Sequence, residues 1–307
     1  MARIALKIDA DTDRGTREGV PRLADALERL GARATFLFSL GPDHTGRAIR
    51  RVFRRGFFGK VRRTSVVQHY GVKTLLYGTL LPGPHIGRRC APTMRNVAER
   101  AFEVGVHTYD HARWQDGVAS ADAAWTRREL QRAQSEFAEV FGRLATVHGA
   151  AGWQMNAHVP ALEQEIGFRY ASDVRGDSPF LPSVNGVVIR VPQLPTTLPT
   201  LDELVGRDDL RGGTPVAHLL ALTANNSPDH VFTLHAELEG GAYLGLFAEL
   251  IKAWREQGHE LCDLAALLAT LDQARLPVHT IEAGSVEGRA GLLAVQGPKW
   301  AAVSPPH

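Results

Sequence analysis

The stretch ARIALKIDADTDRGTREGVPRLADALERLGARATFLFSL, residues 2–40, decides the fold class. Its first part places Ile4, Leu6 and Ile8 at alternate positions, which predicts a strand ending at Asp9. The middle part spaces its apolar residues three and four apart over Val20–Leu30 and stops at Gly31, as an amphipathic helix does. The run ATFLFSL then has the length of a buried strand. Strand, helix and strand in this order predict a parallel sheet.

The alternation of helices and strands continues to about residue 275. The apolar periodicity predicts further helices over residues 121–141, 244–257 and 263–274. Further strands are expected at GFRYASD and HVFTLHAE, and in a run that ends at His107. This order favours one α/β domain over residues 1–275 in the form of a barrel. Residues 276–307 are Gly-rich and remain an unassigned C-terminal tail.

The composition is that of a globular protein. The 307 residues are 44% hydrophobic and 22% charged, which argues against wholesale disorder. Cys90 and Cys262 form no CxxC or zinc-finger pattern, which suits a reducing compartment. The N-terminus lacks the apolar region of a signal peptide, and no apolar run reaches 18 residues. We therefore expect a cytoplasmic protein without a membrane-spanning helix.

Carboxylate and histidine side chains follow several of the predicted strands. Asp9 and Asp11 follow the first strand, His107 ends a later one, and His235 ends HVFTLH. In VHTYDHARW, His111 comes four residues after His107. Because α/β barrels place their chemistry at the carboxyl ends of the strands, we expect these side chains to converge on one pocket.

These residue types permit metal-assisted hydrolysis of an amide. His107, His111 and Asp11 can supply the two nitrogens and the carboxylate that a catalytic divalent ion takes, which leaves a position for water. Asp9 could remove a proton from that water, and His235 could protonate a leaving amine. Each piece alone has a plainer interpretation: a solvated histidine pair, an aspartate that caps a turn, and a structural histidine.

The motifs resemble those of the polysaccharide deacetylase (NodB homology) superfamily, whose members are metal-dependent carbohydrate amidases. KIDADTD is similar to the motif that pairs a base aspartate with a ligand aspartate, HTYDH to the H[ST]xxH metal motif, and FTLHAE to the motif of the acid histidine. The likeness is greater to a branch that deformylates 4-deoxy-4-formamido-L-arabinose on undecaprenyl phosphate. It is carried by FSLGPDHTGR, AAGW, SDVRGDSPF, LPTTLPTLDELVGRD and LHAELEGGAY, and it spans about residues 3–270.

The resemblance implies a fold, a cofactor and an activity. The fold is a distorted (β/α) barrel of the NodB type. The cofactor is a divalent ion on Asp11, His107 and His111, with zinc first and cobalt, nickel or manganese as alternatives. Asp9 becomes the base and His235 the acid in a reaction that releases formate and a free amino sugar lipid for lipid A modification. The alternatives are a deacetylase of another N-acetylated glycan and a non-enzymatic membrane-binding module whose metal is structural.

The sequence departs from the superfamily pattern at the third motif. An arginine usually approaches the base there, whereas HGAAGWQMN has none. We expect Arg175 to orient Asp9 and Asp173 to polarise His235 instead. By analogy with the family, the AAGW backbone ending at Trp153 donates a hydrogen bond to the oxyanion. The plainer interpretation is a tight turn with a buried tryptophan.

Residues 44–98 contain twelve Arg and Lys but no Asp or Glu, although the whole chain carries only +2. Arg50 and Arg54 belong to a set of arginines at helical spacing, interleaved with apolar and aromatic residues. We interpret residues 44–88 as a basic helical insertion that faces an anionic membrane, here the cytoplasmic side of the inner membrane. A polyprenyl phosphate substrate would need such cations and apolar surface. A solvated surface helix is the alternative, and nucleic-acid binding is the least favoured.

Overall fold

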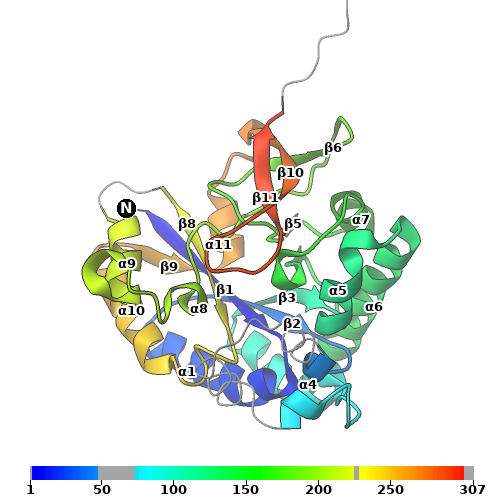
Figure 1. Cartoon of the computed structure of the whole chain (residues 1–307), viewed down its shortest axis with the longest axis horizontal. Coiled ribbons are helices and arrows are strands. Elements are labelled where there is room, and N and C mark those ends of the chain that lie inside the picture. The colour runs from blue at the N-terminus through cyan, green and yellow to red at the C-terminus, as the bar shows by residue number, and fades with distance from the viewer. Residues whose placement is uncertain (1, 48–72, 225–227, 301–307) are drawn as a thin grey trace, which may run out of the picture.

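The main element of the fold is a curled sheet of seven parallel strands. The computed structural model describes residues 2–47, 73–224 and 228–300. The strand order is β5-β4-β3-β2-β1-β8, and β9 also pairs with β1 (Figure 1). The strands are β1 Arg3–Ala10, β2 Thr35–Ser39, β3 Glu103–Thr108, β4 Val147–His148, β5 Tyr170–Ala171, β8 His230–His235 and β9 Glu260–Cys262. The predicted α/β class is confirmed, and the sheet forms an open half-barrel.

Helices cover the outer face of this sheet and pack side by side in the order α7, α6, α4, α1, α10 and α9. The longer helices are α1 Val20–Arg29, α4 Ile86–Glu99, α6 Ala123–Phe141, α7 Val159–Ile166, α9 Pro215–Leu222 and α10 Leu244–Glu256. The shorter helices and turns are η1 Gly15–Gly19, α5 His111–Gly117, η2 Val118–Ser120, η3 Ala151–Trp153, α8 Leu201–Leu204, η4 Arg211–Gly213, α11 Leu264–Ala269 and η5 Gln273–Arg275. In the described part of the chain, no helix combines the length and the apolar character needed to cross a bilayer.

Alternate residues of β1 give the strand an apolar face toward the outer helices and a polar face toward the inside of the sheet. Ile4, Leu6 and Ile8 belong to the large apolar core between the sheet and the outer helices. The intervening Lys7 and Asp9 point to the inner face, because successive side chains of a strand point in opposite directions. At the amino ends of the strands this inner face is filled by an apolar cluster of Ala5, Leu37, Val147, Tyr170, Leu194, Val231, Cys262, Leu264, Leu267 and Leu268. Polar groups are therefore left for the carboxyl ends.

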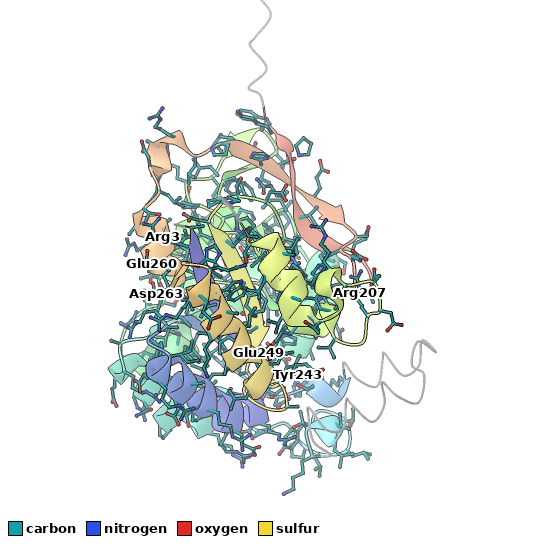
Figure 2. The ribbon with its side chains drawn as sticks, turned by 90° about the vertical axis from the view of Figure 1, so that its left-hand side faces the viewer. Arg3, Arg207, Tyr243, Glu249, Glu260 and Asp263 are labelled. Carbon is teal, nitrogen blue, oxygen red and sulfur yellow. The ribbon has the colours of Figure 1, made fainter. Side chains whose placement is uncertain are left out.

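The amino ends of β1 and β9 are joined at the surface. Arg3 Nε lies 3.2 Å from Glu260 Oε2, and Asp263 follows β9 nearby (Figure 2). Asp263 accepts a hydrogen bond from the backbone of Ala266 and caps α11, which packs against β1. An ion pair and the capped helix α11 therefore occupy this end of the sheet, whereas the predicted site residues lie at the other end.

The segment after residue 275, to which the sequence gives no assignment, forms two strands of a second sheet. This sheet has the order β11-β10-β6-β7 and consists of β6 Leu181–Val184, β7 Val187–Val188, β10 Val278–Gly284 and β11 Leu293–Lys299. The backbone of Arg175, in the loop after β5, exchanges hydrogen bonds of 2.9 and 2.7 Å with Ala294 and Gln296 of β11. The C-terminal strands are thus attached to the loops at the mouth of the main sheet (Figure 1).

Residues 48–72 of the basic insertion lie outside the described residues. The predicted interfacial helix with Arg50 and Arg54 falls in that part of the chain. The neighbouring residues 73–85 are described, and Asp43 Nα donates a 2.9 Å hydrogen bond to the carbonyl of Pro84, which joins the two ends of the insertion. The insertion therefore leaves the fold after β2 and returns directly before α4.

Candidate active site

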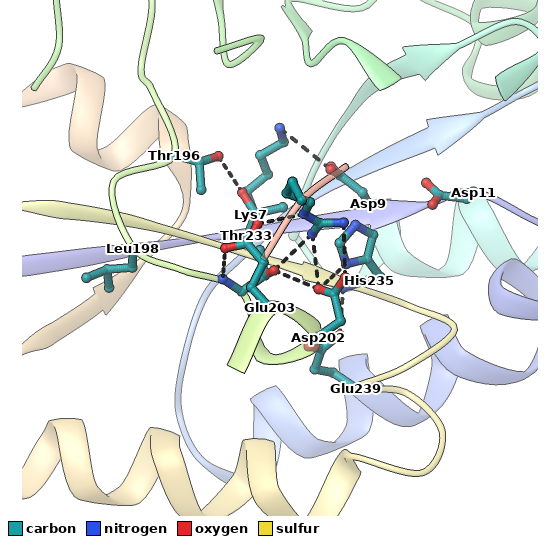
Figure 3. Close-up of polar contacts among 12 residues, drawn as sticks. Lys7, Asp9, Asp11, Thr196, Leu198, Asp202, Glu203, Thr233, His235 and Glu239 are labelled. Carbon is teal, nitrogen blue, oxygen red and sulfur yellow. Dashed lines mark hydrogen bonds and ion pairs between the residues drawn. The ribbon is translucent and has the colours of Figure 1, made fainter. Parts of the chain in front are cut away.

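The carboxyl ends of three strands bring the predicted polar residues together. In the parallel register of β1 and β8, Asp9 is the direct partner of His235. β3, on the other side of β2, carries His107 near its end. Because paired residues of parallel strands lie in one layer and on one face, Asp9 and His235 stand side by side on the inner wall (Figure 3). The expected convergence of these side chains is therefore seen.

Asp11, His107 and His111 form a compact trio. His107 Nε2 lies 3.2 Å from Asp11 Oδ1, and His111 Nε2 lies 3.4 Å from Asp11 Oδ2. One candidate ligand atom from each residue lies within 4.8 Å of the others. Asp110 caps the start of α5 by accepting a hydrogen bond from Arg113, so His111 occupies the first turn directly after β3. This cap brings the second histidine back to the strand end.

The protonation of the trio fits a bound cation. His107 Nδ1 must carry the hydrogen, because it donates a 2.6 Å hydrogen bond to the carbonyl of Gly149. Its Nε2 faces the Asp11 carboxylate, so both atoms are directed at the position that a divalent ion would occupy. Burial alone raises the pKa of Asp11, but the charges of His111 and His107 and a hydrogen bond hold it far below its usual range. Burial lowers the pKa of His111, which favours the neutral ring that a metal needs.

Lys7 is the cation beside the predicted base. Its side chain is fully buried, and Nζ lies 3.6 Å from Asp9 Oδ2 and donates a 2.8 Å hydrogen bond to the carbonyl of Ser172. A Cβ at Gly149, in the third motif, would lie only 3.3 Å from this Nζ. Because position 149 is a glycine, there is room beside it for the side chain of Lys7, which comes from β1. The predicted partner of Asp9, Arg175, is engaged elsewhere.

Asp173 also lies elsewhere than predicted. In place of the expected contact with His235, it accepts a 2.7 Å hydrogen bond from the backbone of Ala150 and lies 3.0 Å from His148 Nδ1. His148 Nδ1 also lies 2.6 Å from Glu163, and all three side chains are fully buried. Burial raises the pKa of Glu163, whereas the charge of His148 and hydrogen bonds outweigh burial and lower the pKa of Asp173. The cluster holds the turn whose Gly149 carbonyl accepts the hydrogen bond from His107.

The predicted acid has a different carboxylate beside it. His235 Nδ1 lies 3.9 Å from Asp202 Oδ1, and its backbone N–H donates a 2.7 Å hydrogen bond to Glu239. Burial alone lowers the pKa of His235, but the carboxylates of Asp202 and Asp11 raise it above the ordinary value. This direction favours the protonated imidazole, the form in which a histidine can act as a general acid.

Trp153 forms the wall next to this histidine. It is buried in the tight turn η3, with its backbone in the left-handed region at φ 52° and its N–H donating to Ala150. The indole Nε1 donates a 3.1 Å hydrogen bond to Thr196, and the ring meets His235 edge-on at 6.3 Å. A strained residue at a site wall is typical of functional turns. A hydrogen bond from AAGW to an oxyanion stays a prediction.

Glu237 holds the loop that carries Asp11. Its Oε1 accepts hydrogen bonds of 3.1 and 2.8 Å from the backbones of Asp11 and Thr12, and one of 2.7 Å from the Thr12 hydroxyl. Burial raises the pKa of this carboxyl to about 8. Gly15 is required here, because a Cβ would meet Glu237 at 1.9 Å. Neither residue is marked by any periodicity in the sequence.

Known proteins resemble this chain over most of its length. Residues 4–171 match the family model described as polysaccharide deacetylase. A protein of Shewanella sediminis (strain HAW-EB3), named "Probable 4-deoxy-4-formamido-L-arabinose-phosphoundecaprenol deformylase ArnD", is 36% identical over 96% of this chain and 95% of its own. A protein of the same name from Wigglesworthia glossinidia brevipalpis is 29% identical over 92% of this chain and 98% of its own.

Solved structures share the fold at low identity. A polysaccharide deacetylase structure from Mycobacterium smegmatis has a TM-score of 0.58 at 16% identity and covers 93% of this chain and 96% of its own. The Bc1960 peptidoglycan N-acetylglucosamine deacetylase has a TM-score of 0.52 at 13% identity, with 88% and 89% covered. At these identities the likeness concerns the fold alone, and the site must be argued from the residues of this chain.

Proposed function

Because the chain belongs to the polysaccharide deacetylase family, whose members hydrolyse carbohydrate amides, we propose that it removes the formyl group of 4-deoxy-4-formamido-L-arabinose linked to undecaprenyl phosphate. The products are formate and the free amino sugar lipid, which then serves lipid A modification. This substrate appears in the names of the two relatives. The observation that carries the proposal is the layer of Asp9 and His235 beside the trio of Asp11, His107 and His111.

We assign Asp11, His107 and His111 as the residues that would hold a divalent ion, with zinc first and cobalt, nickel or manganese as alternatives. Two histidine nitrogens and one carboxylate are a common donor set of catalytic zinc. Such an ion, when bound, polarises an amide carbonyl and makes water acidic. The hydrogen bond from His107 to Gly149 fixes the tautomer in which Nε2 is free to bind it.

Asp9 and His235 divide the proton transfers between them. Asp9, whose Oδ1 is buried without a hydrogen-bond partner among the described residues, accepts the proton of the attacking water. Lys7 pairs with this carboxylate at 3.6 Å and holds it on the inner face. His235 donates its proton to the amine nitrogen while the C–N bond breaks. Water thereby supplies the hydroxyl of formate, and the amino sugar leaves as a neutral amine.

We also propose that the protein works at the cytoplasmic surface of the inner membrane. A substrate on undecaprenyl phosphate is held in that membrane, and residues 44–98 supply twelve basic residues without an acidic one. Changing Arg50, Arg51, Arg54 and Arg55 to Gln should move the protein from the membrane to the soluble fraction at low salt. Sedimentation with membranes as before would contradict this role of the basic insertion.

Formate release from the lipid-linked formamido sugar tests the proposed activity. Native protein with zinc should release formate, whereas Asp9→Asn should release none and still bind one metal ion per chain by elemental analysis. His111→Ala should lose the metal. Loss of metal from Asp9→Asn would make Asp9 a ligand rather than a base. If metal-loaded native protein released acetate from an N-acetylated glycan but no formate, the alternative deacetylase would replace the proposal.

A further inference from the structure

The loop between β10 and β11 reaches the predicted acid through Arg289. The guanidinium makes a two-point contact with Asp202, with Nη1 at 3.0 Å from Oδ2 and Nη2 at 3.1 Å from Oδ1. Its Nε lies 2.6 Å from Glu203 Oε1 (Figure 3 shows these carboxylates beside His235). Paired contacts of this kind fix a carboxylate in orientation as well as in position. A segment far along the chain thus meets the mouth of the main sheet.

Apart from Arg289, few contacts among the described residues fix the orientation of the Asp202 carboxylate relative to His235. It lies in α8, a helix of only four residues, and its Oδ1 accepts one further hydrogen bond of 2.6 Å, from Thr200. Burial alone raises the pKa of Asp202, but Arg289 and His235 lower it, so the carboxylate stays ionised. The Oδ1 atom that Arg289 contacts is also the one 3.9 Å from His235 Nδ1. Small rotations of this carboxylate therefore decide whether it supports the imidazole.

The position of Arg289 is determined from several sides. Glu203 binds both Arg289 and Arg175, and the two guanidinium groups lie 4.9 and 5.0 Å from the centre of the Trp153 ring. Two residues earlier in the same loop, Glu287 pairs with Arg207 at 2.6 Å. Figure 2 shows Arg207 on the side of the molecule away from Arg3 and Glu260, where the amino ends of the strands meet. The middle of the loop is therefore fastened at two neighbouring points, Glu287 and Arg289.

We propose that Arg289 is a positioning residue of the reaction, which holds Asp202 so that this carboxylate orients and supports His235. The C-terminal strands are then part of the catalytic unit rather than a tail. The charged groups that act on His235 are Asp202, Asp11, Arg289 and Glu239, and Arg289 reaches it through the first of these. The inference rests on the proposed function for the role of His235 as acid, but the contact network does not depend on the substrate.

A double-mutant cycle tests the proposal. Arg289→Gln should lower kcat about tenfold with little change in KM, a coupling typical of residues in one ion-pair network. Arg289→Lys, which keeps the charge without the planar fork, should recover part of that loss. Asp202→Asn should lower kcat at least as much and should move the alkaline limb of the kcat/KM profile to lower pH. In the Asp202→Asn background, Arg289→Gln should cost nothing further.

A matched control and a readout without turnover complete the experiment. Arg207→Gln removes the outer ion pair of the loop and should leave kcat within about twofold, as surface changes usually do. If Arg207→Gln and Arg289→Gln lowered kcat equally, Arg289 would only anchor the loop, and the proposal would fail. It would also fail if the losses of kcat from Arg289→Gln and Asp202→Asn were additive. In 15N-histidine-labelled protein, the His235 signal, assigned with His235→Gln, should shift in Arg289→Gln toward its Asp202→Asn position. If the His235 signal does not move, the proposal is refuted, whatever the formate assay shows. Absence of formate from the native protein would by itself refute only the proposed function.

Discussion

Replacing Lys7 by Met tests the electrostatics of the site without any substrate. Methionine matches the length of the lysine stem and suits a buried position, so the main change is the loss of the ammonium group. Lys7 is fully buried and the Asp9 side chain is 4% exposed, so solvent does not screen the pair. The substitution leaves an uncompensated carboxylate in the inner wall of the sheet.

The expected cost follows from the geometry. At the observed 3.6 Å, opposite charges attract by about 4–5 kcal/mol for an effective dielectric constant of roughly 20. Breaking a buried pair by removing one partner typically costs about 3–5 kcal/mol. The hydrogen bond to the Ser172 carbonyl adds about 1 kcal/mol. We therefore expect Lys7→Met to lower the free energy of unfolding by about 3–5 kcal/mol, a large part of the roughly 5–15 kcal/mol of a typical domain.

Urea unfolding of metal-free protein, followed by tryptophan fluorescence, measures this cost. Lys7→Met with Asp9→Asn should recover most of the lost stability, because neither charge is then left alone. Arg127→Met, which removes the exposed pair with Glu165, is the control and should cost less than about 1 kcal/mol. If the double variant were no more stable than Lys7→Met, the two charges would not be coupled and Lys7 would not be the partner of Asp9.

Three further outcomes are expected. Gly149→Ala should lower the urea midpoint, at a cost of about 1–3 kcal/mol, because its Cβ would lie 2.4 Å from Leu37 Cδ1; an unchanged midpoint would mean that the inner wall yields freely. Burial lowers the pKa of His148, but Asp173 and Glu163 raise it to about 10, so its charge stabilises the fold fully below about pH 6.5, and this contribution is lost as the pH rises through 10. The free energy of unfolding should therefore fall between about pH 6.5 and pH 10, and it should fall less in His148→Gln. The same pH dependence in both proteins would contradict this role of His148. Adding zinc to chelator-treated protein should raise the Tm by several degrees, and His111→Ala should abolish the rise.

The sequence predicts the main sheet and the strand-end residues because both follow from local periodicity. The alternation over Ile4–Ile8 gives the first strand, and Asp9, His107 and His235 then fall at strand ends in sequence order. The same alternation places Lys7 on the face of Asp9. From the sequence alone, however, a single lysine in a strand is predicted to be exposed to solvent. Its burial could be predicted only if both faces of the strand were known to be buried.

Other parts of the site have no local signal. Asp202 lies in a four-residue helix, Arg289 in a loop, and they meet across 87 positions of sequence. Asp173 and Arg175 lie in a motif that resembles the family, but side chains two positions apart after a short strand take different directions, and each found another partner. Such contacts depend on how loops from separate elements meet, which periodicity does not encode.

The place of β1 between β2 and β8 has a consequence for the order of synthesis. β2 is synthesised shortly after β1, but β8 begins only at His230. At about 5–20 residues per second, the edge of β1 that pairs with β8 therefore stays unpaired for roughly ten to forty seconds. An apolar edge exposed for that long invites pairing with other nascent chains. Lys7 and Asp9 place charges on the inner face of this waiting strand, and inward charges are a known protection of sheet edges. We therefore expect Lys7 and Asp9, beyond the roles proposed for them in the folded protein, to oppose aggregation of the incomplete chain.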